Sequence, residues 1–280
     1  MIDARLISPT DLAELRASGA PLTVLDVRWR LDRPDGRPEY EAGHIPGAVY
    51  VSLDDELAAH GDATDGRHPL PAIADLQAAA RRWGIDTGDT VVVYDDWLSF
   101  GAARAWWVLT DAGVPDVRLL DGGLAAWRQA GLPLATGEEP APRGDIALTP
   151  GHRRRLDIDE AAGLPERGVL LDVRAPERYR GESEPIDPRA GHIPGARNLP
   201  VGGNLDADGR FLPAEQLRAR FAAQGVEDDT ELGLYCGSGV SAAQAVFAAR
   251  LAGLAPALYV GSWSQWSNHA DRSVATGDSA

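Results

Sequence analysis

The chain has 280 residues, with 27 lysine and arginine residues against 42 aspartate and glutamate residues, and a net charge of −15. This negative charge argues against nucleic acids and anionic membranes as partners, because both attract positively charged protein surfaces. No apolar run approaches the roughly 20 residues that span a bilayer, and the first residues lack the pattern of a secretory signal. The single cysteine excludes an internal disulfide and is typical of a reducing cytoplasm.

The first half alternates short apolar runs with amphipathic segments. Residues 24–27 (VLDV) and 91–95 (VVVYD) are rich in branched residues, which is typical of strands buried on both faces. Residues 73–83 and 102–112 carry apolar residues at spacings of three and four, which predicts helices. Proline, glycine and charge then replace this periodicity over residues 135–150, which indicates a linker.

The second half shows the same alternation. Residues 169–173 (VLLDV) and 232–236 (LGLYC) predict buried strands, and residues 214–224 and 241–251 predict helices. Alternating strands and helices predict an α/β fold in which helices flank a parallel sheet on both faces. In such folds ligands bind where the carboxyl ends of the strands lead into loops.

An internal repeat relates the two halves. Residues 25–28 and 171–174 both read LDVR, and residues 43–48 and 191–196 both read GHIPGA, in the same order. A coincidence of this kind is improbable, so we predict a tandem duplication of one domain. The predicted division is a domain over 1–136, a linker over 137–152 and a second domain over 153–280.

The one cysteine, Cys236, opens a glycine-rich turn between a predicted strand and a predicted helix. Gly237 and Gly239 allow a sharp turn whose N–H groups point inward, and the following helix adds its positive end. Such a nest would stabilise the thiolate of Cys236. A lone cysteine is often a small buried apolar residue, but a core position needs no such turn. The equivalent residue in the first half is Asp95, so the fold itself requires no thiol there.

Other uses of a cysteine loop fit this sequence less well. A cysteine phosphatase needs an arginine at the end of its loop, where this chain has Ala242. A cysteine protease needs a neighbouring histidine as its base, and neither GHIPGA motif adjoins the loop. The six histidines and one cysteine show no metal-ligand spacing, so we predict neither a metal nor a cofactor. A small, mostly neutral pocket suits sulfur transfer, in which the thiolate takes up a sulfur atom as a persulfide.

These motifs resemble those of the tandem rhodanese-type sulfurtransferases, which carry GHIPGA in each half and an active loop that starts with cysteine. The resemblance covers nearly the whole chain, through LDVRAPERY at 171–179, both GHIPGA motifs, CGSGVSA at 236–242 and GSWSQW at 261–266. As in that family, the N-terminal copy has no cysteine. The resemblance implies two rhodanese-like domains, of which the second is catalytic.

The composition of the loop bears on the sulfur donor. Thiosulfate enzymes of the family resemble CRKGVTA, with cations for a dianion, whereas 3-mercaptopyruvate enzymes resemble CGSGVTA. This chain reads CGSGVSA, so the resemblance favours 3-mercaptopyruvate. The loop itself offers hydroxyls and amides but no cation, which agrees with that choice.

The resemblance also implies roles for individual residues. Cys236 is the expected nucleophile and persulfide carrier, Ser238 a hydrogen-bonding group near the substrate, and Arg178 the ligand of the donor's carboxylate. The rest of the loop is expected to bind substrate: Gly237, Gly239, Val240 and Ser241. The hydroxyl of Ser241 is also expected to cap the helix that follows.

The resemblance also implies that two aspartates and one histidine lie near the reacting groups. Asp172 is expected beside the active loop in a supporting role, with capping of the sheet end as the alternative. Asp54 and His68 match the positions of a proton relay and are expected at the domain interface, across from Cys236. The alternative is that Asp54 and His68 are ordinary exposed loop residues without a part in the reaction.

The sequence departs from the family pattern at one carboxylate-binding position. The pattern has an arginine in an EPR-like segment, and this chain has Ile186 there. Arg189, or failing that Arg180, is therefore expected as the second ligand of the carboxylate.

Two histidines and two tryptophans are common to the repeats or lie close to them. His44 and His192 occur in both halves, whereas the cysteine occurs in one, so a structural role is expected for both. Trp266 matches a tryptophan of the first half and is expected in the core. Trp263 could instead form a wall of the pocket.

The sequence thus predicts a cytoplasmic enzyme that takes sulfur from 3-mercaptopyruvate onto Cys236 and passes it to a thiol such as thioredoxin, or to cyanide. One alternative is a thiosulfate:cyanide sulfurtransferase. The other is a persulfide carrier that acts only with a partner protein. No cofactor, metal, nucleic acid or membrane is expected as a partner in any of these functions.

Overall fold

The computed structural model describes residues 4–278, which form two compact units. The first unit holds residues 4–59, Leu70–Arg153 and Leu205–Phe211. The second holds His60–Pro69, Arg154–Asn204 and residues 212–278. A short segment from each half therefore belongs to the unit that the other half builds. The repeat in the sequence did not predict these two exchanges.

The first unit is built on a five-stranded parallel sheet with the strand order β1-β5-β4-β2-β3. Its strands are β1 (Arg5–Ile7), β2 (Leu22–Asp26), β3 (Ala48–Tyr50), β4 (Thr90–Tyr94) and β5 (Val117–Leu120). The central strands β2 and β4 are almost wholly buried, which explains their unbroken apolar sequence.

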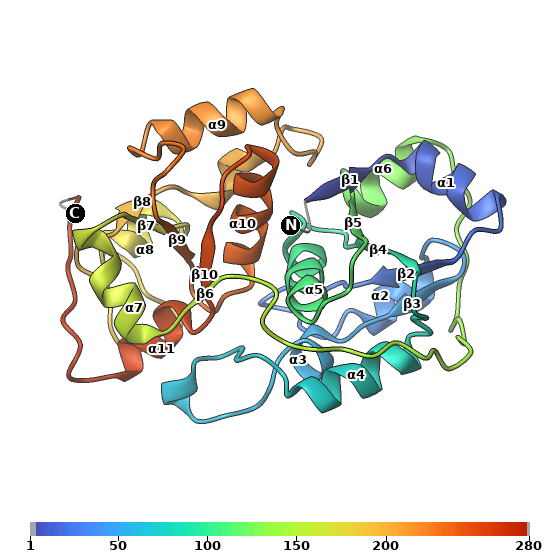
Figure 1. Cartoon of the computed structure of the whole chain (residues 1–280), viewed down its shortest axis with the longest axis horizontal. Helices are drawn as coiled ribbons and strands as arrows, with labels where there is room; N and C mark the ends of the chain where they lie inside the picture. Colours follow the sequence, from blue (N-terminus) through green and yellow to red (C-terminus); the bar gives the residue numbers. More distant parts are fainter. Residues whose placement is uncertain (1–3, 279–280) are drawn as a thin grey trace. The chain divides into compact units, whose positions relative to one another are not determined.

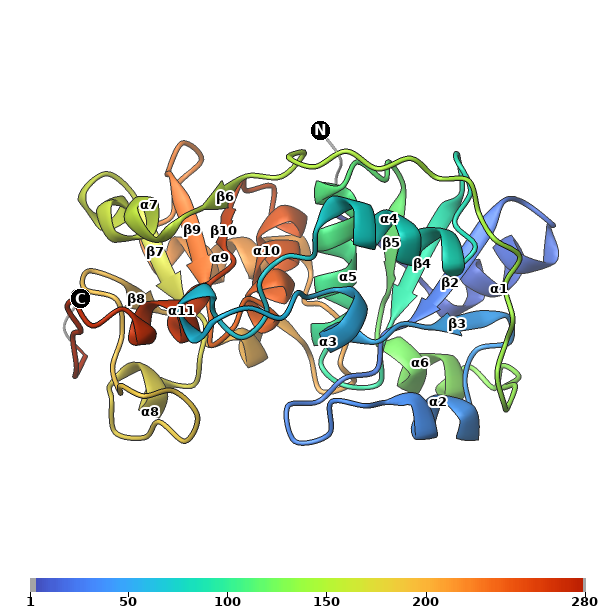
Figure 2. The same ribbon diagram turned by 90° about the horizontal axis from the view of Figure 1, so that it is seen from below.

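Helices cover both faces of this first sheet. They are α1 (Pro9–Ala17), α2 (Arg37–Ala42), α3 (Leu53–Glu56), α4 (Ile73–Arg82), α5 (Phe100–Asp111) and α6 (Gly123–Gln129). Figure 2 shows α4 and α5 on one side of the sheet and α2 and α6 on the other. Every residue of α5 after Phe100 is buried, as expected for a helix that is apolar around most of its surface.

The second unit repeats this topology, with a five-stranded parallel sheet in the order β6-β10-β9-β7-β8. Its strands are β6 (Arg155–Leu156), β7 (Val169–Asp172), β8 (Arg197–Asn198), β9 (Leu232–Tyr235) and β10 (Ala257–Tyr259). Counted within each unit, the strand orders are identical. The predicted fold class, two α/β domains with parallel sheets, is confirmed.

The helices of the second unit are α7 (Ile158–Gly163), α8 (Pro176–Tyr179), α9 (Ala214–Ala222), α10 (Ser241–Leu251) and α11 (Ser262–Asn268), with the 3₁₀ helices η1 (Ala63–Asp65), η2 (Leu164–Glu166) and η3 (Val201–Asn204). Figure 1 shows α9 and α10 side by side. The bounds of α10 match the prediction. Helix α9 ends before the predicted residue 224, and Gly225 follows with a left-handed φ of 77°. Among residues 4–278, no helix has the length and hydropathy needed to cross a membrane.

The predicted linker contains no helix or strand and packs along the first unit. The N–H of Gly144 donates to the carbonyl of Arg81 at 2.8 Å, and that of Ile146 donates to Ile85 at 3.2 Å. The side chains of Ile146 and Leu148 are buried. This stretch is therefore an ordered part of the first unit.

The histidines of the two GHIPGA motifs make the same contacts in each unit. His44 is fully buried, stacks on Tyr40 at 4.0 Å and donates from Nδ1 to the carbonyl of Tyr40 at 2.8 Å. His192 is equally buried, stacks on Tyr179 at 3.8 Å and donates to the carbonyl of Tyr179 at 2.8 Å. Because the geometry is the same with and without a cysteine nearby, it supports the expected structural role of both histidines.

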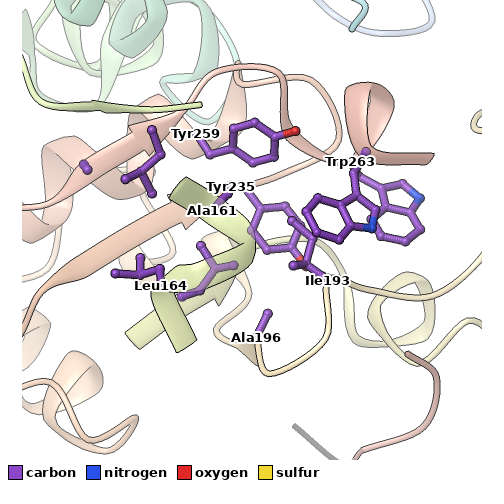
Figure 3. Packing of buried hydrophobic residues seen from close by; sticks show 11 residues of the cluster. Ala161, Leu164, Ile193, Ala196, Tyr235, Tyr259 and Trp263 are labelled. Carbon is purple, nitrogen blue, oxygen red and sulfur yellow. The ribbon is translucent and has the colours of Figure 1, made fainter. Parts of the chain in front are cut away.

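The core of the second unit lies beside the end of β9 (Figure 3). Tyr235, the last residue of β9, is fully buried, and its hydroxyl accepts a hydrogen bond from the N–H of Ile193 at 3.1 Å. Trp266 belongs to this core, as predicted. Trp263, for which a place in the pocket wall was the alternative, is fully buried in the same core.

Candidate active site

Cys236 directly follows β9, at the carboxyl edge of the second sheet, and is only 2% exposed. The backbone N–H of Gly239 points back at the thiol, with 3.1 Å between N and Sγ. Gly239 has a φ of 78°, a left-handed conformation that residues with a side chain rarely adopt. The turn therefore directs a backbone donor at the sulfur, as the predicted nest requires.

The first residues of α11 hold the backbone of the cysteine in place. The N–H of Cys236 donates to Oγ of Ser262 at 3.2 Å, and its carbonyl accepts from the N–H of Trp263 at 2.9 Å. The carbonyl of Gly237 accepts from the N–H of Ser264 at 2.8 Å. These three bonds keep both peptide groups around Cys236 fixed, so the thiol needs no reorganisation to meet its donor.

The corresponding turn of the first unit shows what this backbone offers an anion. Asp95 stands where the second unit has Cys236, and its carboxylate accepts N–H bonds from Trp97, Ser99 and Ala102 at 3.0 to 3.1 Å. Burial raises the pKa of Asp95 to about 7, although these three bonds act in the opposite direction. In the first unit the carboxyl group of Asp95 thus occupies the turn.

Two guanidinium groups lie against the turn at Gly237. A Cβ atom placed on Gly237 would lie 3.0 Å from Nη2 of Arg67 and 3.5 Å from Nη1 of Arg178. The side chains of Arg67 and Arg178 are 27% and 18% exposed, so both reach solvent. The loop itself has no cation, but the site does. Arg178 was expected from the sequence, whereas Arg67 reaches the turn from a separate segment of the chain.

The negative charges of two buried acidic side chains balance the positive charges of these arginines. Nη2 of Arg178 donates to Glu184 at 2.6 Å and to Asp187 at 3.3 Å, and Arg67 pairs with Asp187 as well. The side chains of Glu184 and Asp187 are each 3% exposed. Burial raises the pKa of Asp187, and the two arginines counteract that effect. With all four groups ionised, the positive and negative charges of this cluster cancel.

Asp172 braces this cluster through Arg174. The fully buried carboxylate of Asp172 accepts hydrogen bonds from the guanidinium of Arg174, at 3.0 Å from Nε and 2.6 Å from Nη2. Arg174 then donates to Glu184 at 3.2 Å. The first unit holds the same pair, Asp26 with Arg28 at 2.7 Å. Since that unit has no cysteine in its turn, the geometry favours a bracing role for Asp172.

Arg67 comes from the segment His60–Pro69, which packs on α11 (Figure 2). The N–H of Arg67 donates to Oγ of Ser264 at 3.1 Å. Gly66, with a φ of 88°, lies so close to the backbone that a Cβ would come within 2.8 Å of the carbonyl of Gly261. A pocket of about 490 Å³ opens beside this segment, and its lining includes Arg67, Ile186 and Asp187.

The remaining loop residues lie in the turn or at its end. Ser238 and Val240 are buried within the turn. Helix α10 begins at Ser241 itself, and its cap residue, Val240, makes no side-chain hydrogen bond to the helix. The predicted cap by Ser241 is therefore wrong, because its hydroxyl lies one position too far along the chain.

The two predicted relay residues belong to different units. Asp54 lies on α3 of the first unit, where it accepts a hydrogen bond from Nε1 of Trp29 at 2.9 Å. His68 is buried in the second unit, one residue after Arg67. Their joint action on a proton stays a prediction. No group of three or more potential metal ligands occurs in the described part of the chain.

The two arginines expected as second carboxylate ligands have other contacts. Arg189 donates to four backbone carbonyls, those of Trp266, Ser267, His269 and Arg272, at 2.7 to 2.9 Å. Arg180 pairs with Glu182 at 2.8 Å. These contacts do not favour either residue as a substrate ligand.

Sequence reasoning did not single out Arg67, Glu184 or Asp187 as parts of a charged cluster. Arg174 could have been recognised as the last residue of the repeated LDVR motif. Arg67 carried no such signal, because it comes from the other half of the sequence and adjoins Gly237 only after folding.

Comparison with known proteins agrees with this geometry. The rhodanese-like domain matches the chain twice, over residues 8–130 and 157–269. A protein named putative thiosulfate sulfurtransferase SseB, from Mycobacterium tuberculosis, is 50% identical over 278 residues, 97% of each chain. A probable 3-mercaptopyruvate sulfurtransferase from Pseudomonas aeruginosa is 48% identical, over 99% of this chain and 100% of the relative.

The solved structures include SseA from Escherichia coli, a 3-mercaptopyruvate sulfotransferase. It superposes with a TM-score of 0.83 at 30% identity, over 93% of this chain and 99% of that one. Each half of the chain matches the domain, and the relatives align over nearly their whole lengths. The chain therefore belongs to the rhodanese-like family and is a tandem-domain sulfurtransferase.

Proposed function

We propose that this chain moves a sulfur atom from 3-mercaptopyruvate to a thiol or to cyanide, through a persulfide on Cys236. One observation carries the proposal. The sulfur of Cys236 faces the N–H of Gly239, while the guanidinium groups of Arg67 and Arg178 lie beside Gly237. One side of the turn thus suits a negative sulfur, and the other side suits a carboxylate.

In the first half-reaction the donor's carboxylate binds at Arg178, and the thiolate of Cys236 attacks the donor's sulfur. An S–S bond forms and the donor's C–S bond breaks, with its electron pair passing to carbon as the enolate of pyruvate. The proton of the donor's thiol is the one the enolate needs, so pyruvate and a Cys236 persulfide result. The N–H of Gly239 is placed to donate to the sulfur throughout.

The proton transfer is assigned to Ser238 and His68, with Asp54 as the third member of the relay. Ser238 lies in the turn itself and His68 follows Arg67 directly. A hydroxyl and an imidazole at neutral pH are suited to pass a proton to an enolate. Substitution of any of the three should slow formation of pyruvate more than alkylation of Cys236.

In the second half-reaction the acceptor attacks the outer sulfur of the persulfide. A thiolate becomes a persulfide, or cyanide becomes thiocyanate, and the Cys236 thiolate is restored. Thioredoxin is the proposed protein acceptor. The thiolate must stay reduced between turnovers, so we place the protein in a reducing compartment such as the cytoplasm.

Thiosulfate is the second candidate donor, since two guanidinium groups at Gly237 would also attract a dianion. The charges of the cluster decide between the donors. Glu184 and Asp187 already balance Arg67 and Arg178, so a donor with one negative charge is accepted more readily than one with two. This balance favours 3-mercaptopyruvate.

Steady-state kinetics with both donors, with cyanide and with thioredoxin, test the proposal. We expect kcat/KM to be higher for 3-mercaptopyruvate, and Cys236→Ala to be inactive with either donor. Intact-mass spectrometry should show one added sulfur atom on the native protein after incubation with the free donor. A large advantage of thiosulfate would overturn the donor assignment, and an adduct that forms only with a partner protein would indicate a persulfide carrier.

A further inference from the structure

The placement of Arg67 suggests a role that no motif of the sequence assigns. Its Nη2 lies against Gly237, and its N–H is held by Ser264 at 3.1 Å. Its Nε is buried and has no hydrogen-bond partner among residues 4–278. Because that Nε is buried, it is Nη2, beside Gly237 on a side chain that is 27% exposed, that is placed to bind an anion from solution.

Asp187 links this guanidinium to Arg178. Its carboxylate is almost wholly buried and pairs with Arg67 through one oxygen and with Arg178 through the other. Its own N–H donates to Glu184 at 3.1 Å, which holds the two acids side by side. The arginines are therefore kept at the turn by a fixed negative charge, and that charge repels any anion that enters.

We propose that Arg67 is the second guanidinium that binds the donor's carboxylate, beside Arg178, and that Asp187 makes the site selective for donors with a single negative charge. The inference rests on the proposed function, because it assigns residues to the donor site of that reaction. Arg67 and Arg178 supply the nitrogen atoms nearest to the Cβ position of Gly237, so they can bind one carboxylate from two directions.

Alkylation of Cys236 in the full-length protein tests Arg67 without any need for turnover. Iodoacetate carries a carboxylate and iodoacetamide is its neutral counterpart, so the ratio of their rate constants measures anion binding at the turn. We expect Arg67→Gln to lower this ratio roughly tenfold, as the loss of one charge-assisted hydrogen bond would, with the iodoacetamide rate within about twofold of the native value.

Arg218→Gln is the matched control. Arg218 has a side-chain exposure of 30% and one ion-pair partner, Asp228, on the same unit. Its substitution should leave the ratio unchanged. If Arg67→Gln also leaves the ratio unchanged, or if Arg180→Gln lowers it as much, the assignment to Arg67 is overturned.

Protection experiments test the selectivity that is ascribed to Asp187. Pyruvate, a monoanion, and sulfate, a dianion, are compared as protectants of Cys236 against iodoacetamide. We expect Asp187→Asn to increase protection by sulfate relative to pyruvate, roughly tenfold, because one fixed negative charge is removed. Ile186→Lys adds a positive charge at an exposed residue next to Asp187 and should act in the same direction without disturbing a buried pair. If Asp187→Asn leaves the preference unchanged while Ile186→Lys changes it, or if neither variant changes it, the selectivity assigned to Asp187 is wrong.

Donor kinetics separate this inference from the proposed function. With 3-mercaptopyruvate, Arg67→Gln should raise KM more than it lowers kcat, because the carboxylate is bound alike in the ground state and the transition state. If the native protein turned over neither donor, the proposed function would fail. The alkylation ratio would still support or overturn anion binding by Arg67.

Discussion

The N–H of Gly239 lies 3.1 Å from the sulfur of Cys236, inside a turn whose backbone the start of α11 holds fixed. In the first unit the same turn surrounds the carboxylate of Asp95. The duplicated fold therefore builds one turn lined by N–H donors twice and fills it differently. Only the copy with a thiol can form a covalent bond to sulfur.

Replacement of Cys236 by serine should abolish sulfur transfer and leave the fold intact. Serine is nearly isosteric, but its hydroxyl is not ionised at neutral pH and cannot carry a sulfur atom. We expect kcat to fall by at least about 1,000-fold, with little change in the melting temperature. Persistent transfer at the native rate, measured as thiocyanate formed, would contradict a persulfide on this residue.

Gly239→Ala should impair the reactivity of the thiol as well as stability. A side chain at a φ of 78° costs about 1–2 kcal/mol, and relief of that strain moves the N–H away from the sulfur. Gly253→Ala is the matched control, because Gly253 has a φ of 80° with open space at its Cβ position. Both variants should lose similar free energy of unfolding in urea. Only Gly239→Ala should react more slowly with iodoacetamide.

The stability of the first unit should depend on the protonation of Asp95. Its pKa is about 7 in the fold against an ordinary value of 3.8, so between these pH values the folded state binds a proton that the unfolded state has lost. Its contribution to stability is therefore present in full below about pH 4 and is lost as the pH rises through 7. Relative to Asp95→Asn, the native protein should lose on the order of 4 kcal/mol over that range.

Urea denaturation of both proteins at a series of pH values measures this dependence. Groups other than Asp95 titrate alike in the two proteins, so the difference in their free energies of unfolding isolates the one carboxyl. A difference that stays constant from pH 4 to pH 8 would show that Asp95 is ionised throughout, held so by its three N–H donors.

His192→Phe should lower stability without removing activity. The substitution keeps a ring to stack on Tyr179 but removes the Nδ1 hydrogen bond to its buried carbonyl, at a cost of about 1–3 kcal/mol. His44→Phe should cost a similar amount, because its contacts with Tyr40 have the same geometry. If His192→Phe lost kcat while keeping its native stability, His192 would have a catalytic role.

Much of the fold followed from short stretches of the sequence. The apolar runs at β2, β4, β7 and β9 predicted buried parallel strands, and the paired LDVR and GHIPGA motifs predicted two copies of one domain. These properties are local, since burial on both faces requires an unbroken apolar run. The turn at Cys236 could also be predicted from a short stretch, because two glycines within four residues are typical of a sharp turn.

Packing decided what the local patterns left open. The sequence left open whether Trp263 lines a pocket or packs in the core, and it lies in the core because α11 turns it toward Tyr235. Ser241 could have capped α10 by its residue type, but the helix begins one residue earlier than that role requires. A shift of one position in a helix boundary is too small for sequence periodicity to define.

The sequence by itself determined that a lone thiol lies in a glycine-rich turn at the end of a buried strand. Only the tertiary structure decided which charges surround it. Arg67 is separate in the chain from Arg178 and Asp187, and it reaches Gly237 and Asp187 because the segment His60–Pro69 packs on α11. Coulombic contacts depend on distance in space, and the order of residues alone does not specify that distance.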